Sequence, residues 1–310
     1  MAQLVVETTD LTKKYGTFTA VNRLNLKIEE GEVFGFLGAN GAGKTTTMLM
    51  LLGLTEPTSG TARVCGMDPA REPLEVKRLV GYVPERVGFY EELTAKQNLR
   101  YTADLNRIRR AEAEDKIVSL LGSVGLGEVM DHPVATFSRG MKQRLGLADV
   151  WLKDPKLAFL DEPTTGIDPN GIDDILKLIS SMAKRGITII FCSHVLPQVQ
   201  KICSRVGILS KGNLVADGPI DRLGRDAAAA GRYRMEAEVE DLKASVVEAV
   251  RKTEGVEEVE ATGNILVVTA RSDMRGQISR AIIDSGGLLL GMKIEEYNLD
   301  KIYKRFSKEA

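Results

Sequence analysis

The sequence predicts an α/β protein with a second, smaller α+β domain at its C-terminal end. Over roughly the first 220 residues, short β-rich runs alternate with helical patterns, which is the order of elements in a parallel sheet covered by helices. A composition break follows at 223–231, where the run GRDAAAAG is typical of a helix end or a linker. We therefore expect a first domain over 1–222, a linker over 223–231 and an accessory domain over 232–310.

Compact apolar runs predict the strands of the first domain. Each is short and apolar on both faces, as in strands buried within a parallel sheet, and they span 33–37, 79–83, 157–160 and 187–192. Between Glu91 and Trp151 the pattern turns helical, with one apolar stripe formed by Ile117, Leu120, Leu121 and Val124. We expect a helical insert there, over about 86–150.

The second domain repeats an alternating strand followed by a helix. Strands are predicted at 233–239, 265–269 and 288–294, and apolar residues at helical spacing lie between them, over 242–250 and 274–282. The order of strand, helix, one or two strands, helix and strand is that of a ferredoxin-like split βαβ sandwich. A terminal helix is expected to carry Leu299, Ile302, Tyr303 and Phe306.

Composition excludes several classes of protein. The chain holds 42 Lys and Arg against 43 Asp and Glu, so it has no global basic field and no nucleic-acid partner is expected. The three cysteines are too far apart for a CxxC metal or redox site and lie beside apolar residues, which predicts reduced core residues in a cytoplasmic protein. The longest apolar stretch, 48–54, is too short to span a membrane, and the start lacks a signal peptide's apolar region. If the protein works at a membrane, another chain must cross it.

A phosphate-binding loop is predicted at Gly38–Thr45. These residues match GxxxxGK[ST], follow the apolar strand 33–37 and open the helical run 45–54, which is the context that the motif requires. Glycines let backbone N–H groups converge on phosphate oxygens, Lys44 reaches the β- and γ-phosphates, and the Thr45 hydroxyl can bind Mg²⁺. The competing interpretation, an accidental glycine-rich turn, is disfavoured by the flanking strand and helix.

Two carboxylates end the apolar strand 157–160. Asp161 is positioned to hold the Mg²⁺ shell, and Glu162 would project into the crevice beyond the sheet and polarise an attacking water. A strand that ends in Asp-Glu is, taken alone, more often a solvated turn. Together with the phosphate-binding loop, the pair predicts hydrolysis of a nucleoside triphosphate.

Residues 137–145 (FSRGMKQRL) resemble the signature motif of ATP-binding cassette (ABC) ATPases. The resemblance covers residues 4 to about 220, with the family's motifs in order: Tyr15 as the adenine-stacking aromatic, 38–45 as Walker A, 81–85 (GYVPE) at the Q-loop, the signature, Walker B, 166–169 (GIDP) as the D-loop and His194 as the switch histidine. It implies a P-loop NTPase fold of ABC ATPase type, with a RecA-like core, an antiparallel β subdomain and a helical subdomain.

The resemblance also assigns roles. It implies that ATP is bound by Tyr15, Gly38, Asn40, Gly41, Ala42, Gly43, Lys44, Thr45, Thr46, Glu85, Ser138, Gly140 and Asp168. Glu162 and His194 would be catalytic, and Mg²⁺ would be bound by Thr45, Glu85 and Asp161. In this family two nucleotide-binding domains close head to tail around two ATP molecules. A single set of motifs therefore implies a dimer in which Ser138 and Gly140 contact the γ-phosphate held by the other copy's Lys44.

Two positions depart from the family pattern. Glu85 replaces the usual glutamine, and FSRGM at 137–141 replaces LSGGQ. A carboxylate at Glu85 still reaches Mg²⁺ or a water but adds negative charge, so we expect altered metal dependence. Both variants resemble ATPase subunits of type 2 ABC exporters. The strings at 87–90 (VGFY) and 192–197 (CSHVLP) resemble the ATPase subunit that serves maturation of nitrous oxide reductase.

The implied function is ATP hydrolysis that drives export through a separate membrane subunit, which would contact the region around Val87, Phe89 and Tyr90. Local core packing of Phe89 and Tyr90 is the alternative. The expected location is cytoplasmic, peripheral on the inner face of the cell membrane.

Two other classes of function are weighed against this one. A soluble ABC ATPase acting on nucleic acid or the ribosome would carry a long coiled coil or a second cassette, but only 94 residues separate Lys44 from Ser138 and one set of motifs is present. A C-terminal domain that senses a ligand would show clustered polar residues. None is evident beyond residue 231, so support of the dimer is the preferred role.

Overall fold

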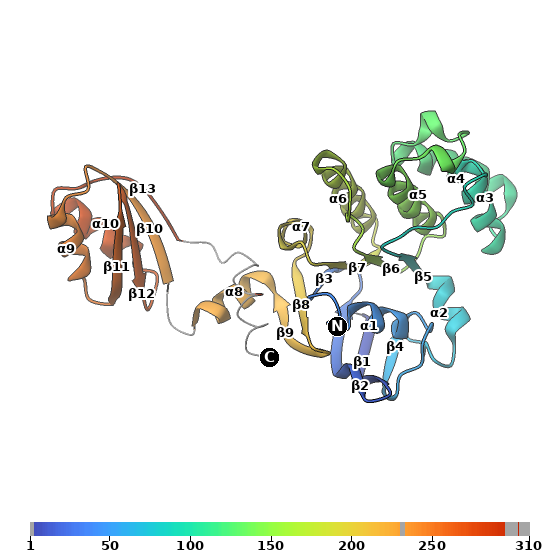
Figure 1. Cartoon of the computed structure of the whole chain (residues 1–310), viewed down its shortest axis with the longest axis horizontal. Coiled ribbons are helices and arrows are strands. Elements are labelled where there is room, and N and C mark those ends of the chain that lie inside the picture. The colour runs from blue at the N-terminus through green and yellow to red at the C-terminus, as the bar shows by residue number, and fades with distance from the viewer. Residues whose placement is uncertain (1–2, 230–232, 295–302, 304–310) are drawn as a thin grey trace. The chain divides into compact units, whose positions relative to one another are not determined.

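A computed structural model of the chain describes residues 3–229, 233–294 and 303 (Figure 1). The chain divides into two compact units, one within 1–220 and the other within 221–305. No helix among the described residues is both long enough and apolar enough to cross a membrane.

The central sheet of the first unit is parallel except for one edge strand. Its order is β5-β6-β7-β3-β8-β9, and its strands are β3 (Val33–Leu37), β5 (Val80–Val83), β6 (Leu157–Asp161), β7 (Thr188–Ser193), β8 (Arg205–Ser210) and β9 (Asn213–Pro219). Strand β9 runs antiparallel to β8. The predicted strands are present, and the one expected at 79–83 begins at Val80 because Leu79 ends a helix. Strands β8 and β9 were not predicted.

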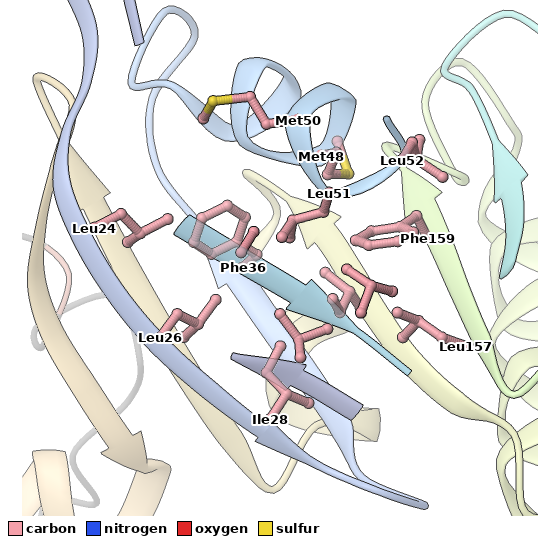
Figure 2. Close-up of a cluster of buried hydrophobic side chains, with 14 of the residues drawn as sticks. Leu24, Leu26, Ile28, Phe36, Met48, Met50, Leu51, Leu52, Leu157 and Phe159 are labelled. Atoms are coloured by element: carbon pink, nitrogen blue, oxygen red, sulfur yellow. The ribbon is translucent and has the colours of Figure 1, made fainter. Parts of the chain in front are cut away.

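An antiparallel sheet packs against this core. Its order is β2-β1-β4, and its strands are β1 (Leu4–Tyr15), β2 (Phe18–Glu29) and β4 (Ser59–Val64). Figure 2 shows side chains of both sheets meeting helix α1 (Lys44–Leu51) in one cluster: Leu24, Leu26 and Ile28 of β2, Phe36 of β3, Met48, Met50 and Leu51 of α1, and Leu157 and Phe159 of β6. All of them are almost fully buried, and this apolar layer supports the loop that precedes α1.

The three cysteines are free, as predicted. Cys192 and Cys203 are buried, and Cys65 packs half-buried against the core that Figure 2 shows.

Helices fill the connections between the parallel strands. They are α2 (Pro73–Leu79), α3 (Ala95–Leu105), α4 (Arg110–Ser123), α5 (Arg139–Leu152), α6 (Pro169–Lys184) and α7 (Leu196–Ile202), with short 3₁₀ turns at Gly127–Val129 and Val134–Thr136. Helices α3, α4 and α5 form the predicted helical insert between the neighbouring strands β5 and β6 (Figure 1). Its predicted apolar stripe is buried at Ile117, Leu120, Leu121 and Val124. A capping box at Thr94 and Gln97 starts α3.

The linker expected at 223–231 overlaps a helix for most of its length. Helix α8 (Ile220–Ala229) occupies most of this stretch, and residues 230–232 lie outside the described ranges. Alanine has the highest helix propensity of all residues, so the run of alanines extends the helix that Ile220 begins.

The second unit has the element order β10 (Tyr233–Glu240), α9 (Ala244–Arg251), β11 (Val256–Thr262), β12 (Ile265–Ala270), α10 (Arg275–Asp284) and β13 (Leu288–Ile294). Its sheet is antiparallel with order β11-β12-β10-β13, which is the arrangement of a ferredoxin-like fold. Alternate residues of β10, Met235, Ala237 and Val239, form a core with Val246 of α9 and Ile278 of α10. Of the predicted terminal helix, only Tyr303 is among the described residues.

Candidate functional site

The loop between β3 and α1 wraps around the ammonium group of Lys44. Nζ of Lys44 donates hydrogen bonds to the carbonyl oxygens of Gly38, at 2.6 Å, and Ala39, at 3.3 Å. Lys44 is the first residue of α1 and is buried, so its charge lies beside the unpaired N–H groups at the start of that helix. A buried cation beside a helix N-terminus forms a site for phosphate.

Two glycines of this loop have physical reasons to be glycine. Gly43 has φ +108°, and a Cβ at this position would lie 2.5 Å from the carbonyl oxygen of Ala20. At Gly38 a Cβ would lie 2.7 Å from the carbonyl oxygen of Leu209. Both contacts are to backbone atoms, which cannot rotate aside. The loop is therefore seated on neighbouring strands.

Thr45 and Asp161 meet across the start of α1 and the end of β6. Oγ1 of Thr45 donates a hydrogen bond of 3.2 Å to Oδ2 of Asp161. Burial raises the pKa of Asp161, the Thr45 hydrogen bond opposes this effect, and the nearby carboxylates of Glu162 and Glu85 raise the pKa further. Hydroxyl and carboxylate oxygens under such negative charge suit a hard divalent cation.

No cluster of three or more His, Cys, Asp or Glu side chains among the described residues is arranged to hold a metal ion by itself. Mg²⁺ usually takes one or two carboxylates, such as Asp161 beside the Thr45 hydroxyl, and completes its shell with waters and substrate phosphates. The residues present therefore fit Mg²⁺ bound together with a nucleotide.

Glu162 lies directly after β6 in an unusual backbone conformation. Its φ is +48°, and its N–H donates to the carbonyl oxygen of Cys192 in β7, at 2.9 Å. Oε1 lies 2.9 Å from Nδ1 of His194, which follows β7. Oε2 is buried and has no hydrogen-bond partner among the described residues. One carboxylate oxygen is thus held by a histidine, and the other remains free to accept a hydrogen bond from water.

These residues surround one cavity of about 270 Å³. Its lining includes most of the predicted ATP and Mg²⁺ residues, namely Tyr15, Asn40, Gly41, Gly43, Lys44, Thr45, Thr46, Glu85, Asp161 and Glu162. Of the other residues of the phosphate-binding loop, Gly38 and Ala42 do not line it, and His194 reaches it only through Glu162. Tyr15 is half exposed at the rim, as stacking of a base requires.

Phe18 also lines this cavity and was not predicted. It pairs with Tyr15 across the turn between β1 and β2 and is 61% exposed. Its position three residues after Tyr15 in the sequence could have indicated a second aromatic residue at the nucleotide site.

The remaining predicted residues begin helices elsewhere in the unit. Ser138 caps α5, with its Oγ accepting a hydrogen bond of 3.3 Å from the N–H of Met141. Asp168 caps α6 by accepting one of 3.1 Å from Gly171. Neither these two residues nor Gly140 line the cavity of their own chain.

A second cavity, of about 380 Å³, lies between the segment after β5 and the helical insert. It is lined by Gly88, Phe89, Tyr90, Asn98, Tyr101, Thr102 and Asp149. The rings of Tyr90 and Tyr101 meet edge to face at 5.1 Å, and Asn98 holds the backbone of Tyr90 through hydrogen bonds in both directions. Val87 does not line this cavity and packs against Gly146 of α5.

Comparison with known proteins decides the family. The family model described as ABC transporter matches residues 21–165. The bacitracin transport ATP-binding protein BcrA of Bacillus licheniformis is 36% identical over 301 residues, which are 96% of each chain. The chain belongs to the ABC transporter family. The linearmycin resistance ATP-binding protein LnrL of Bacillus subtilis is 29% identical over 307 residues and matches 96% of this chain and 97% of its own length.

A solved ATP-binding subunit of an ABC transporter has the same fold over the first unit. It is 32% identical, with a TM-score of 0.66, and covers 72% of this chain and 92% of its own. These matches confirm the predicted fold. They also confirm the predicted function: the chain is the ATP-binding subunit of an ABC exporter, and it couples ATP hydrolysis to transport. ATPases of this family work with membrane subunits in transporter complexes. The solved structure covers 72% of this chain, whereas the matches to BcrA and LnrL cover 96% and so extend through the C-terminal unit.

Proposed function

We propose that two copies of this chain close head to tail around two ATP molecules and drive export through a separate membrane subunit. The observation that carries the proposal is the buried Oε2 of Glu162, which has no partner among the described residues and belongs to a carboxylate oriented by His194 beside the phosphate-binding loop. A free acceptor at this position suits the water that attacks a γ-phosphate.

The residues would act in sequence. Lys44 and the N–H groups at the start of α1 hold the β- and γ-phosphates, and Tyr15 stacks on the adenine. Thr45, Asp161 and Glu85 would hold Mg²⁺, which neutralises phosphate charge when bound. Glu162 accepts the proton of the attacking water as the new bond to the γ-phosphorus forms and the bond to the β-phosphate oxygen breaks. His194 keeps the Glu162 carboxylate in place and would act on the γ-phosphate charge through Glu162, because it does not itself line the cavity.

Dimerisation is supported by the predicted ATP-binding residues that do not line the cavity of their own chain. Ser138 and Gly140 begin α5, and Asp168 begins α6, so their backbone N–H groups offer anion-binding positions away from their own chain's cavity. In a head-to-tail pair these positions would face the γ-phosphate held by the second copy. The C-terminal units would support this pair.

The first test is Mg²⁺-dependent ATP hydrolysis by the full chain beside Glu162→Gln, with light scattering to measure mass with and without ATP. We expect the wild type to turn over and the variant to form an ATP-bound dimer, because the amide cannot take the water's proton. The exposed carboxylate of Glu248, in the second unit, supplies the matched control Glu248→Gln, which should behave as wild type. Full hydrolysis by Glu162→Gln would contradict the assigned base.

The membrane subunit would dock at the cavity between Phe89, Tyr90 and Tyr101. The half-buried Phe89 and half-exposed Tyr90 there are suited to the apolar face of a short amphipathic helix. Phe89→Asp should abolish coupled transport in membranes while the purified chain keeps its basal ATPase. Coupled transport that survives in Phe89→Asp would contradict this docking site, whereas loss of both activities would indicate misfolding. Docked on that membrane subunit, the protein would be peripheral, on the cytoplasmic face of the cell membrane.

We infer that the transported compound is an antimicrobial drug. Full-length relatives are named for bacitracin transport and linearmycin resistance. Maturation of a copper enzyme is the second candidate, because the strings at 87–90 and 192–197 resemble the ATPase subunit serving nitrous oxide reductase. Deletion of the gene separates the two, since the first predicts raised sensitivity to bacitracin-like compounds and the second predicts inactive nitrous oxide reductase with unchanged drug sensitivity.

A further inference from the structure

The side chain of Arg139 covers a glycine of the D-loop, residues 166–169. Arg139 is the first residue of α5, directly after Ser138. A Cβ on Gly166 would lie 2.4 Å from Nη1, 2.7 Å from Cζ and 3.1 Å from Nε of Arg139. Three adjacent guanidinium atoms thus occupy the space that a side chain at position 166 would need. Gly166 has φ +73°, which also favours glycine.

A second contact joins the same two segments in the opposite direction. Cγ2 of Ile167 would lie 3.7 Å from a Cβ on Gly140 and 2.7 Å from a Cβ on Gly171. The D-loop side chain of Ile167 thus lies near Gly140 of α5, while the Arg139 side chain of α5 lies over Gly166 of the D-loop. Each segment presents a bare backbone to the other's side chain, so they fit together closely.

The contact of Arg139 is not an ion pair. Arg139 is exposed, and within the described ranges its side chain forms neither a salt bridge nor a hydrogen bond. The nearby carboxylate of Asp168 accepts a hydrogen bond from Gly171. Nη1, Cζ and Nε of the planar guanidinium all lie close to Gly166, and a lysine side chain has no such group.

The D-loop in turn connects to Glu162. The N–H of Thr165, immediately before Gly166, donates a hydrogen bond of 3.1 Å to the carbonyl oxygen of Glu162. A short path thus runs from the signature segment through Arg139, Gly166 and Thr165 to the backbone of the proposed base. Each link is a direct contact or a covalent bond, so the path is physically continuous.

We propose that Arg139 is a positioning residue that makes the signature segment, 138–141, and the D-loop move as one body. This rests on the proposed head-to-tail dimer. When Ser138 and Gly140 engage ATP on the second copy, Arg139 draws the D-loop with them and aligns Glu162 in its own chain. The two ATP sites are coupled in this way, and hydrolysis at one depends on closure over the other.

The experiment compares full-length Arg139→Ala, Arg139→Lys and Gly166→Ala. Gly166→Ala leaves the guanidinium intact and removes its seat. Gly186→Ala is the matched control, since Gly186 has φ +90° but nothing within 4 Å of a Cβ, so it imposes similar backbone strain without touching Arg139. Each variant is measured for kcat, for the Hill coefficient in ATP, for binding of a fluorescent ATP analogue and for Tm.

Arg139→Ala and Gly166→Ala should each lower kcat roughly tenfold and bring the Hill coefficient toward one, with ATP-analogue affinity unchanged. The double variant Arg139→Ala/Gly166→Ala should have a kcat no lower than that of either single variant, because both substitutions remove the same contact. Arg139→Lys should resemble Arg139→Ala. Gly186→Ala should keep the wild-type kcat.

Three results would overturn the inference. Full activity in Arg139→Lys would show that charge suffices, as for a direct contact with phosphate. If the decreases in kcat multiply in the double variant, the two residues act independently. If Gly166→Ala and Gly186→Ala have equal kcat values, the contact between Arg139 and Gly166 does not affect hydrolysis. Failure of the proposed function looks different: Glu162→Gln would then form no ATP-dependent dimer, which would overturn this inference as well, whatever the Arg139 variants do.

Discussion

Replacement of Gly43 by alanine tests whether the phosphate-binding loop is seated on its neighbours. The matched variant is Gly41→Ala, since Gly41 also has positive φ, +81°, but has nothing within 4 Å of a Cβ. An L-residue in left-handed conformation costs about 1–2 kcal/mol, which is the expected loss for Gly41→Ala. At Gly43 the Cβ would also lie 2.5 Å from the carbonyl oxygen of Ala20 and 3.1 Å from Cδ2 of Leu209.

Overpacking of this kind adds about 1–3 kcal/mol, so Gly43→Ala should lose about 2–5 kcal/mol in total. The assay is urea unfolding followed by the fluorescence of Trp151, because the single tryptophan is buried in the first unit and reports on that unit alone. Nucleotide is left out, since its binding would stabilise the folded state.

We expect the urea midpoint of Gly43→Ala to lie about 0.5–1 M below that of Gly41→Ala. Equal midpoints would refute the reasoning. They would mean that the loop is free to move away from Ala20 at little cost.

The remaining predictions concern single side chains of the first unit. Burial raises the pKa of Asp149 in the folded state, so the stability of the wild type falls as pH rises through that pKa. Asp149→Asn has no buried carboxylate to ionise, so its gain in unfolding free energy over the wild type should be larger at pH 7 than at pH 4. Ser138→Ala removes the cap of α5 and should cost about 1 kcal/mol in urea unfolding, whereas Ser138→Asp should keep this stability. Arg205 binds the carbonyl oxygen of Lys27 and the carboxylate of Asp217, so Arg205→Met should lose about 2–3 kcal/mol and lower the Tm; an unchanged Tm would show these bonds to be dispensable.

Local patterns predicted the strands that meet at the cavity. The run Val33–Leu37 is apolar on both faces because helices and the second sheet cover it, and such runs are visible without knowing their partners. The same holds for Leu157–Asp161. The phosphate-binding loop was equally readable, because its glycines are needed for backbone reasons that operate within a few residues.

Elements with irregular burial were harder to predict. Strand β1 has register shifts against β2 at several positions, so its buried residues do not alternate, and an alternation rule misses it. The four alanines at 227–230 lie between Gly224 and Gly231, and these glycines suggested a helix end or a linker although α8 continues to Ala229. For β1, pairing with distant strands decides the structure, whereas α8 is favoured by the helix propensity of its alanines.

The contacts between residues distant in sequence had no sequence signal at all. Glu162 and His194 follow different strands, and only the pairing of β6 with β7 brings them to 2.9 Å. Arg139 and Gly166 meet because the helical insert returns to the sheet immediately before β6. The resemblance assigned a role to Glu162 and His194 separately but gave no geometry between them.

The place of β3 in the sheet has a consequence for synthesis of the chain. Val33 pairs with Ile189 of β7, and Phe34 pairs with Arg205 of β8, so the strand before the phosphate-binding loop lies between two strands translated more than 150 residues later. At typical elongation rates this interval lasts roughly 10–30 s. During that time an apolar segment waits without either neighbour. The nucleotide site can therefore form only after β8 has left the ribosome, and nascent chains that stop before it will expose an aggregation-prone strand.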